Sequence, residues 1–407
     1  MIDVDEARRI VLSRVAPLGT QEVPLADGRG RTLARAVRSD VDDPPFDRSV
    51  MDGFAVRAAD VEDVPTRLRV VGQIGAGSEA NRAIEAKQAM QINTGAPIPA
   101  GADAVVRVEH THPVDGGAEV EIRQSAEAGK FITRRAAHIS AGGVVIEPGT
   151  VLGPAEIGAA AGAGASRVVV HRRPRAAVLV TGNELVGVDQ VPRGPQIRNS
   201  NAYVLSALLS SAGVASVDLG IAGDALDELE DRIRIGLQEP VLCITGGISM
   251  GAFDFVPEVL ERCGVTFHIR KMRIKPGRPV IFGMSAEGSA VFALPGNPVS
   301  AMVAFVLLVE PALTALQGRK DVPLARVRAV LGGVLGPTTD RRTFRPGKLT
   351  VGEDGLYRVM PVSWRGSGDL FGMVGSNALI EQAPDSDGCQ AGDEVRVIPM
   401  GGGAAKV

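Results

Sequence analysis

Two apolar runs that end in threonine and glycine decide the fold: residues 175–184 read RAAVLVTGNE, and residues 241–251 read VLCITGGISMG. Each run has about the length of a buried strand, and the chain then turns toward a helical pattern. The same alternation continues along the segment. It predicts strands at 176–180, 217–221, 241–245, 280–282 and 290–293, and helices at 202–212, 225–237, 255–263 and 299–317. Strands that alternate with helices predict a doubly wound α/β domain with a mostly parallel sheet.

The segments on either side of this domain have a different pattern of apolar, charged and glycine residues. Residues 3–15 alternate charged and aliphatic side chains at helical spacing, which predicts a short amphipathic helix. Residues 45–138 and 321–407 contain short valine-rich runs between glycine turns. The first of these segments predicts a small β-rich domain, and the second predicts a β-sandwich or barrel.

The composition excludes several classes of protein. A formal net charge of −3 provides no basic surface for nucleic acid. Cys243, Cys263 and Cys389 form no Cys-x-x-Cys pair, so we expect neither a structural zinc site nor a disulfide framework. The N-terminus carries no apolar signal segment, and the apolar run 301–309 is too short to cross a bilayer. We therefore expect a cytoplasmic protein without a membrane segment.

Glycine and polar residues follow the predicted strands. The strings at the strand ends are Thr181-Gly182-Asn183-Glu184, Gly223-Asp224, Thr245-Gly246-Gly247-Ile248-Ser249-Met250-Gly251 with Asp254 beyond it, and Pro295-Gly296-Asn297-Pro298. In a doubly wound sheet, ligands bind beyond the carboxyl ends of the strands. The sequence therefore predicts a binding site at this edge of the sheet.

Two of these features suit a phosphate group. The glycines of the loop 245–251 let backbone N–H groups turn toward an anion, and a helix N-terminus follows the loop. Lys275 and Arg278 lie in a turn stiffened by proline and glycine, and paired cations suit a phosphate or another oxyanion. The alternatives are a plain tight turn for the loop and solvated surface charges for Lys275 and Arg278.

Three carboxylates at the strand ends suit a divalent metal. Glu184, Asp224 and Asp254 follow three different strands. Mg²⁺ is typically bound by one or two carboxylates together with substrate phosphates. Asp224 also precedes a helix directly, so its alternative role is that of an N-cap.

Seven strings in order along the chain resemble one known family. They are DRSVMDGFAV (47–56), NTGAPIPAGADAVV (93–106), TGNEL (181–185), QIRNSN (196–201), TGGISMGAFD (245–254), KPGRP (275–279) and LPGNPVS (294–300). The chain thereby resembles the molybdopterin molybdenumtransferase family, which includes bacterial MoeA and the E domain of gephyrin. The resemblance covers nearly the whole chain.

The resemblance implies a domain plan and an assembly. The plan is an extended domain (1–44 and 139–174), an inserted β-rich domain (45–138), a doubly wound molybdopterin-nucleotide-binding domain (175–320) and a C-terminal β domain (321–407). The composition changes near residues 45, 138, 175 and 320, in agreement with this plan. The resemblance also implies a homodimer whose active site uses both subunits.

The resemblance further implies a reaction and the residues that perform it. Adenylylated molybdopterin and molybdate react with Mg²⁺, AMP leaves, and molybdenum is inserted at the dithiolene. Molybdopterin adenylyltransferase and apo-molybdoenzymes are the implied transient partners. Catalytic roles are implied for Asp52, Thr94, Glu184, Asp224, Asp254 and Lys275, with Glu184 and Asp254 as metal ligands. Ligand-binding roles are implied for Thr181, Gly182, Thr245, Gly246, Gly247, Ser249, Gly251, Arg278, Pro295, Asn297 and Ser367.

The sequence departs from the family pattern at a few positions. Thr133 replaces an arginine, and Ala137-His138 replaces a Glu-Asp pair. Asn183 replaces an aspartate, whereas Arg278 replaces a lysine and keeps the charge. These departures leave a second hypothesis open, a non-catalytic paralogue that binds the pterin nucleotide or a molybdoenzyme. A third hypothesis is an adenylyltransferase, which needs only the central domain, so the segments 1–174 and 321–407 argue against it.

Overall fold

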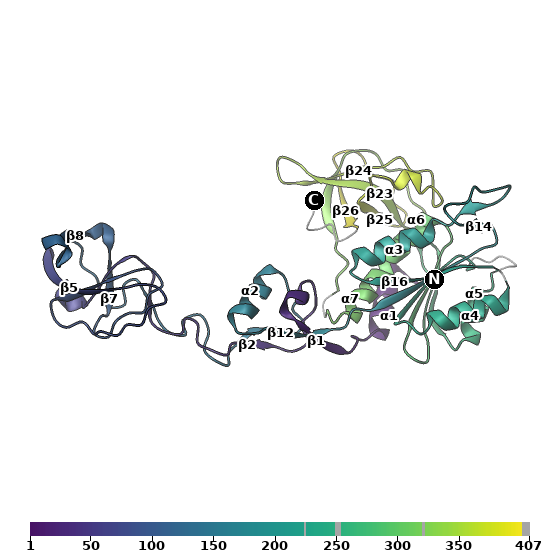
Figure 1. Ribbon diagram of the computed structural model, residues 1–407. Helices are drawn as coiled ribbons and strands as arrows, with labels where there is room; N and C mark the ends of the chain where they lie inside the picture. The colour runs from purple at the N-terminus through teal and green to yellow at the C-terminus, as the bar shows by residue number, and fades with distance from the viewer. Residues whose placement is uncertain (224, 249–253, 320–321, 401–407) are drawn as a thin grey trace. The chain divides into compact units, whose positions relative to one another are not determined.

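The computed structural model describes residues 1–223, 225–248, 254–319 and 322–400. The chain forms two compact units (Figure 1). One consists of Met1–Gln21 together with Val170–Val407, and the other of Glu22–Val169. This is a coarser division than the four domains predicted from the family, whose boundaries remain a prediction.

The larger unit is built on a six-stranded sheet. Its strands are β13 (Arg175–Thr181), β16 (Ala215–Ala222), β17 (Val241–Thr245), β18 (Thr266–Lys271), β20 (Pro279–Met284) and β21 (Ala290–Leu294), in the order β16-β13-β17-β21-β20-β18. The first four strands in this order are parallel, and β20 and β18 are antiparallel additions at one edge. The prediction of a mostly parallel sheet is confirmed. Strand β18, with the sequence TFHIRK, was not predicted.

Helices cover both faces of this sheet, as a doubly wound fold requires (Figure 1). Alternate residues of β13 point to opposite faces: Ala176 and Val178 join one apolar core, and Ala177 and Leu179 join the other. The first core includes helices α1 (Val4–Arg14), α3 (Asn201–Ser211) and α6 (Pro298–Ala304). The second includes α4 (Leu226–Gly236) and α5 (Val256–Arg262). The sheet is thus buried on both sides, and its strand ends are left to form a site.

One long apolar helix runs through the first core. It consists of α6, a π-helical segment η5 (Phe305–Val309) and α7 (Glu310–Leu316). By length and composition Pro298–Leu316 is long and apolar enough to cross a membrane, but it is mostly buried inside the protein, as the core helix of a soluble fold is. The sequence predicted this helix without its π-helical segment. There the buried Arg8 of α1 donates a hydrogen bond to the Leu307 carbonyl (3.0 Å).

The C-terminal part of the larger unit is a closed β-barrel. Its strands are β22 (Val327–Leu331), β23 (Arg342–Val351), β24 (Tyr357–Pro361), β25 (Ala378–Gln382) and β26 (Glu394–Pro399), and the pairing of β23 with β25 closes the ring. The short strand β19 (Ile274–Lys275) adds to β23.

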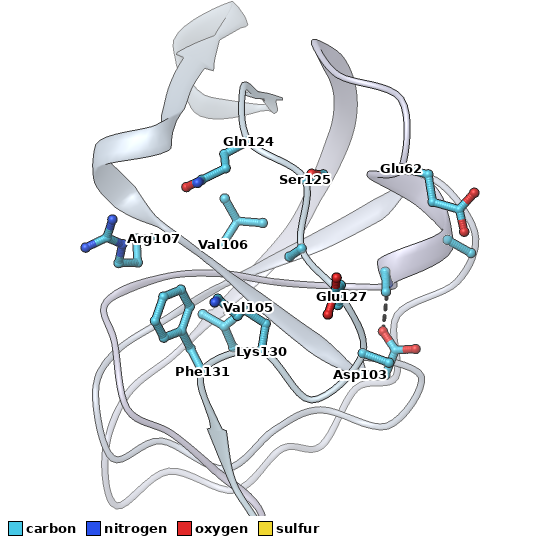
Figure 2. A pocket seen from close by; sticks show the side chains of 14 residues that line it. Glu62, Asp103, Val105, Val106, Arg107, Gln124, Ser125, Glu127, Lys130 and Phe131 are labelled. Carbon is cyan, nitrogen blue, oxygen red and sulfur yellow. Dashed lines mark hydrogen bonds between the residues drawn. The ribbon is translucent and has the colours of Figure 1, made fainter.

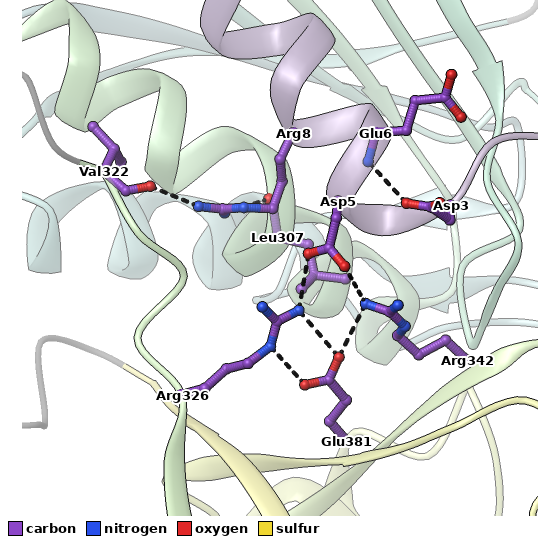
Figure 3. A network of polar contacts seen from close by, with 9 residues as sticks. All are labelled: Asp3, Asp5, Glu6, Arg8, Leu307, Val322, Arg326, Arg342 and Glu381. Carbon is purple, nitrogen blue, oxygen red and sulfur yellow. Dashed lines mark hydrogen bonds and ion pairs between the residues drawn. The ribbon is translucent and has the colours of Figure 1, made fainter.

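Ion pairs tie helix α1 to this barrel (Figure 3). Asp5 and the almost fully buried carboxylate of Glu381 both pair with Arg326 and Arg342. Burial alone would raise the pKa of Asp5, but hydrogen bonds from Arg342 and Arg326 outweigh it and hold that pKa below its usual value.

The smaller unit is mainly β-structure. Strands β4 (Gly53–Val56), β5 (Thr66–Ile74), β6 (Gln88–Ile92), β7 (Ala104–Arg107), β8 (Thr111–Val114) and β9 (Glu119–Ile122) form a sheet in the order β7-β4-β6-β5-β9-β8. Shorter pairs join β2 (Val37–Arg38) to β11 (Val144–Ile146) and β3 (Arg48–Ser49) to β10 (Ile132–Thr133). Helix α2 (Pro154–Gly162) contacts β11. Strands β1 (Thr20–Pro24) and β12 (Arg167–His171) pair where the chain passes between the units.

Candidate functional site

The carboxyl ends of the parallel strands frame a pocket of about 550 Å³. It is lined by Val180, Thr181, Gly182, Glu184, Leu185, Ile197, Asn201, Thr245, Gly246, Gly247, Ile248, Asp254, Pro279, Pro295, Gly296 and Asn297. Most of the site residues predicted in the sheet domain therefore come together in one place. We call this hollow the strand-end pocket.

Glycines are required where β17 leaves the sheet. Gly246 and Gly247 have φ angles of +92° and +64°, in the left-handed region that favours glycine. A Cβ atom on Gly246 would collide with the backbone carbonyl of Thr181, and one on Gly247 would press against Val256 of α5. The two glycines thus let the loop pass close to the end of β13. The loop and this strand end together form the pocket floor.

The floor itself is polar and buried. Thr181 and Thr245 are 6% and 0% exposed, and Asn201 is 8% exposed. The Asn201 amide nitrogen donates to the Gly296 carbonyl (2.8 Å) and to the Thr245 hydroxyl (3.3 Å). One side chain thereby connects the ends of β17, β21 and α3. Asn201 stands within the family string QIRNSN, but its spacing does not distinguish it from a helix-start asparagine, and it was not predicted as a site residue.

Two carboxylates line the pocket. Glu184 follows β13 in the turn toward β14 (Leu185–Val186), and Asp254 precedes α5. In the described part of the chain, no group of three or more His, Cys, Asp and Glu side chains is placed to hold a metal. A cage made only of protein ligands is therefore not formed by these residues. Two carboxylates do suit Mg²⁺ bound jointly with substrate phosphates.

The barrel contributes Ser367 beside the pocket. The Asn297 amide donates to the Ser367 hydroxyl (3.0 Å), and the Val299 backbone N–H donates to the Ser367 carbonyl (3.1 Å). The loop that holds Ser367 is itself fixed by Asp369, which accepts hydrogen bonds from the backbone N–H groups of Arg365 and Gly372 (both 2.9 Å). These two bonds lower the pKa of Asp369.

The two predicted cations do not line the pocket. Lys275 and Arg278 are both exposed. They flank Gly277, which packs against Ser300 of α6, and the next residue, Pro279, does line the pocket. The stiff turn therefore lies near the pocket rim, with its charged side chains in solvent.

Asp52 and Thr94 lie in the smaller unit and contact each other. The backbone N–H of Thr94 donates to the Asp52 carboxylate (2.7 Å), and both residues are exposed. Of the remaining predicted site residues, Asp224, Ser249 and Gly251 lie outside the described residues.

Two of the departures from the family pattern, Thr133 and the Ala137-His138 pair, lie in the smaller unit. Thr133 pairs with Arg48 in the β3–β10 ribbon. The His138 ring lies 3.0 Å from the Asp43 carboxylate, and both side chains are about half exposed. His138 therefore has a carboxylate partner in this chain.

A larger cavity lies in the smaller unit, and none of the site residues predicted from the sequence lines it. Its volume is about 840 Å³, and we call it the β-domain cavity. Figure 2 shows Arg107 and Lys130 beside the ring of Phe131, with Glu62 and Asp103 toward the other side. The Arg107 guanidinium lies 5.6 Å and the Lys130 ammonium 5.1 Å from the ring centroid.

Family models match three consecutive parts of the chain. They are described as the MoeA N-terminal region (domain I and II) for residues 2–164, a probable molybdopterin binding domain for 177–315, and the MoeA C-terminal region (domain IV) for 328–400. A molybdopterin molybdenumtransferase from Haemophilus influenzae is 33% identical, over 98% of this chain and 99% of its own length.

Solved structures agree in fold over the same length. Two structures of a molybdopterin biosynthesis MoeA protein from Pyrococcus horikoshii superpose with TM-scores of 0.82 and 0.83. They are 31% and 26% identical, cover 98% of this chain, and are themselves covered to 99% and 100%. Sequence and fold therefore agree over the whole chain rather than over the sheet domain alone.

Proposed function

The chain belongs to the molybdopterin molybdenumtransferase family of molybdenum cofactor biosynthesis, and from this premise we propose that it inserts molybdate into adenylylated molybdopterin, with Mg²⁺, and releases AMP. The observation that carries the proposal is the strand-end pocket. It combines a glycine-lined floor at the end of β17 with two carboxylates, Glu184 and Asp254. This is the chemistry needed to hold a nucleotide phosphate and a hard cation together.

The proposed reaction has two bond-changing parts. Water adds to the adenylyl phosphorus, the phosphoanhydride P–O bond breaks, and AMP and molybdopterin phosphate result. Molybdate then exchanges one oxide for the two dithiolene sulfurs, and that oxide leaves as water with the two thiol protons. No oxidant or reductant is needed in either part.

The residues of the pocket have separate tasks in this scheme. The glycine loop provides close approach for the phosphates, and Thr181 and Thr245 provide hydroxyl groups at the floor. Glu184 and Asp254 would hold the magnesium ion, which when bound withdraws charge from the phosphate oxygens. Lys275 and Arg278, at the rim, would attract molybdate and phosphate electrostatically.

We further propose that the protein acts in the cytoplasm as a homodimer and passes its product to apo-molybdoenzymes. In this arrangement Asp52 and Thr94 complete the pocket of the partner subunit. Mixing an Asp52→Asn subunit with an Asp254→Asn subunit tests the sharing of sites. Activity recovered in the mixture supports a shared site, and two variants that stay inactive together contradict it.

A direct assay tests the proposed reaction. The purified protein receives adenylylated molybdopterin, Mg²⁺ and molybdate, and both AMP release and transfer of active cofactor to an apoenzyme are followed. Molybdate-dependent AMP release is expected. Tight nucleotide binding without release marks a non-catalytic member of the family, for which the replacements at Thr133, Ala137 and His138 are the motivating observation. Adenylylation of molybdopterin from Mg-ATP without molybdate marks an adenylyltransferase.

A further inference from the structure

Two neighbouring aliphatic side chains line one wall of the strand-end pocket. Leu185 belongs to β14 and Ile197 to β15 (Ile197–Arg198). The two strands form a short parallel pair in which Leu185 lies in register with Ile197, so both side chains point to the same face. Figure 1 shows β14 in an arm that projects from the sheet domain. We call these two side chains the apolar shelf.

The apolar shelf is accessible to a ligand. Ile197 is 55% exposed, whereas Val180 and Ile248, which also line the pocket, are almost fully buried. Leu185 is partly buried because it packs against the first apolar core, which fixes one edge of the shelf. Ile197 therefore presents the most accessible aliphatic surface of this pocket.

Backbone hydrogen bonds hold the apolar shelf beside the proposed phosphate and metal groups. The Ile197 N–H donates to the Glu184 carbonyl (2.8 Å), and the Leu185 N–H donates to the Gly182 carbonyl (3.2 Å). Leu185 also follows Glu184 directly in the chain. The shelf thus lies next to the carboxylate that is proposed to bind magnesium.

An exposed aliphatic surface in a binding pocket is stabilised when an apolar part of a ligand covers it. The phosphates and hydroxyl groups of adenylylated molybdopterin are hydrophilic, whereas the flat faces of its adenine and pterin rings are apolar. We propose that the apolar shelf binds the face of one of these two heteroaromatic rings while the phosphates lie at the glycine loop. The inference rests on the proposed function and deepens it, because it names a subsite for a ring.

Titration calorimetry with two probes that carry one ring each, AMP and molybdopterin, tests this subsite. Ile197→Ala removes most of the exposed aliphatic surface. We expect about 10-fold weaker binding of the probe whose ring covers the shelf, as for the loss of roughly two buried methylene groups. A loss confined to AMP assigns the shelf to adenine, and a loss confined to molybdopterin assigns it to the pterin. Ile197→Leu keeps the apolar area and should bind within about 2- to 3-fold of wild type.

Val191 provides the matched control. It lies in the segment that connects β14 to β15, is 76% exposed, and does not line the pocket. Val191→Ala should therefore leave both affinities unchanged. The heat-capacity change of binding separates a direct contact from a loosened arm, because burial of apolar surface makes it negative. It should become less negative in Ile197→Ala and stay unchanged in Val191→Ala.

The remaining outcomes separate this inference from the proposed function. If Ile197→Ala does not fold, as judged by circular dichroism, Ile197→Thr replaces part of the same apolar surface and provides the same test. Unchanged affinity for both probes overturns the inference while the proposed function stands, and so does a weaker affinity with an unchanged heat-capacity change. A wild-type protein that binds neither AMP nor molybdopterin overturns the proposed function, and the inference falls with it.

Discussion

The strand-end pocket and the β-domain cavity differ in how far their polar side chains are buried and held in place. The pocket, of about 550 Å³, has a floor of buried polar side chains held by internal hydrogen bonds, such as those of Asn201. The cavity, of about 840 Å³, is larger, but Gln124, Glu127 and Lys130 on its wall are all exposed. In the pocket the protein has already desolvated and oriented its polar groups, whereas in the cavity these side chains remain solvated.

The difference teaches that organisation rather than size distinguishes a reaction site. Preoriented groups need little reorganisation when charge develops on a ligand, and so they stabilise it more than mobile surface charges do. The β-domain cavity does contain one strained element, since Phe131 has a φ of +56°. Its charges are of both signs, however, with Glu62, Asp103 and Glu127 opposed to Arg107 and Lys130, so it offers no net field for a polyanion.

The largest expected contrast concerns the carboxylates of the two hollows. Asp254→Asn in the strand-end pocket removes a proposed magnesium ligand, and we expect Mg²⁺-dependent AMP release to fall by about 100-fold or more. Glu127→Gln, on the wall of the β-domain cavity, should leave the rate unchanged. AMP release is measured across a Mg²⁺ titration, with the unfolding midpoint as a control for folding. A normal rate in Asp254→Asn would show that Asp254 is not part of the reaction site. A slow rate in Glu127→Gln would show that the β-domain cavity contributes to the reaction.

The next contrast concerns glycines that share a backbone conformation. Gly246 and Gly129 have φ angles of +92° and +88°, so alanine at either position costs about 1–2 kcal/mol of backbone strain. At Gly129 the new Cβ meets open space, but at Gly246 it meets the Thr181 carbonyl. We therefore expect Gly246→Ala to be more destabilised and to bind nucleotide about 10-fold more weakly, with binding intact in Gly129→Ala. Urea unfolding and calorimetry provide the measurements, and equal losses in the two variants would show that the close approach to Thr181 is unimportant.

The location of the strand-end pocket could be predicted from the sequence, because apolar runs followed by glycine mark the ends of buried strands. The apolar runs that end at Thr181 and Thr245 placed two glycine loops at one edge of a predicted parallel sheet, and the structure brings those loops together. Parallel strands separated by helices leave few arrangements of the chain, so residues far apart in sequence could be assigned to the same edge.

Other features depended on packing that no local pattern encodes. The bonds from Asn201 to Thr245 and Gly296 join residues 44 and 95 positions apart, and their distances follow from the folded backbone alone. Lys275 and Arg278 were predicted on charge, but whether a long side chain enters a pocket depends on rotamers that the sequence does not specify. The β-domain cavity was missed because its lining combines strand β7 with segments that are distant in the sequence, around residues 58–62 and 124–131.

The smallest expected effect concerns the Ser367 loop, which gives the pocket a contact that the β-domain cavity lacks. The pKa of Asp369 is lowered by the N–H groups of Arg365 and Gly372, so its ionised form stabilises the loop. This stabilisation is complete above the unfolded-state pKa of about 3.9 and is lost as the pH falls through the lower folded-state value. Trp364, the only tryptophan, lies in this loop, and its fluorescence should report the loss during an acid titration.

Variants of two aspartates decide whether that titration belongs to Asp369. Asp369→Asn should abolish the Trp364 transition below pH 4 and weaken nucleotide binding about 2- to 3-fold at neutral pH, because one of the two backbone bonds loses its acceptor. Asp354→Asn is the matched control, because a hydrogen bond from Arg358 lowers the pKa of Asp354 to about 2 and the residue lies in a different turn of the barrel. A Trp364 transition that persists in Asp369→Asn and disappears in Asp354→Asn would assign the acid sensitivity to the turn that holds Asp354. The Ser367 contact would then be independent of the Asp369 carboxylate, and the strand-end pocket would owe its rigidity to the sheet alone.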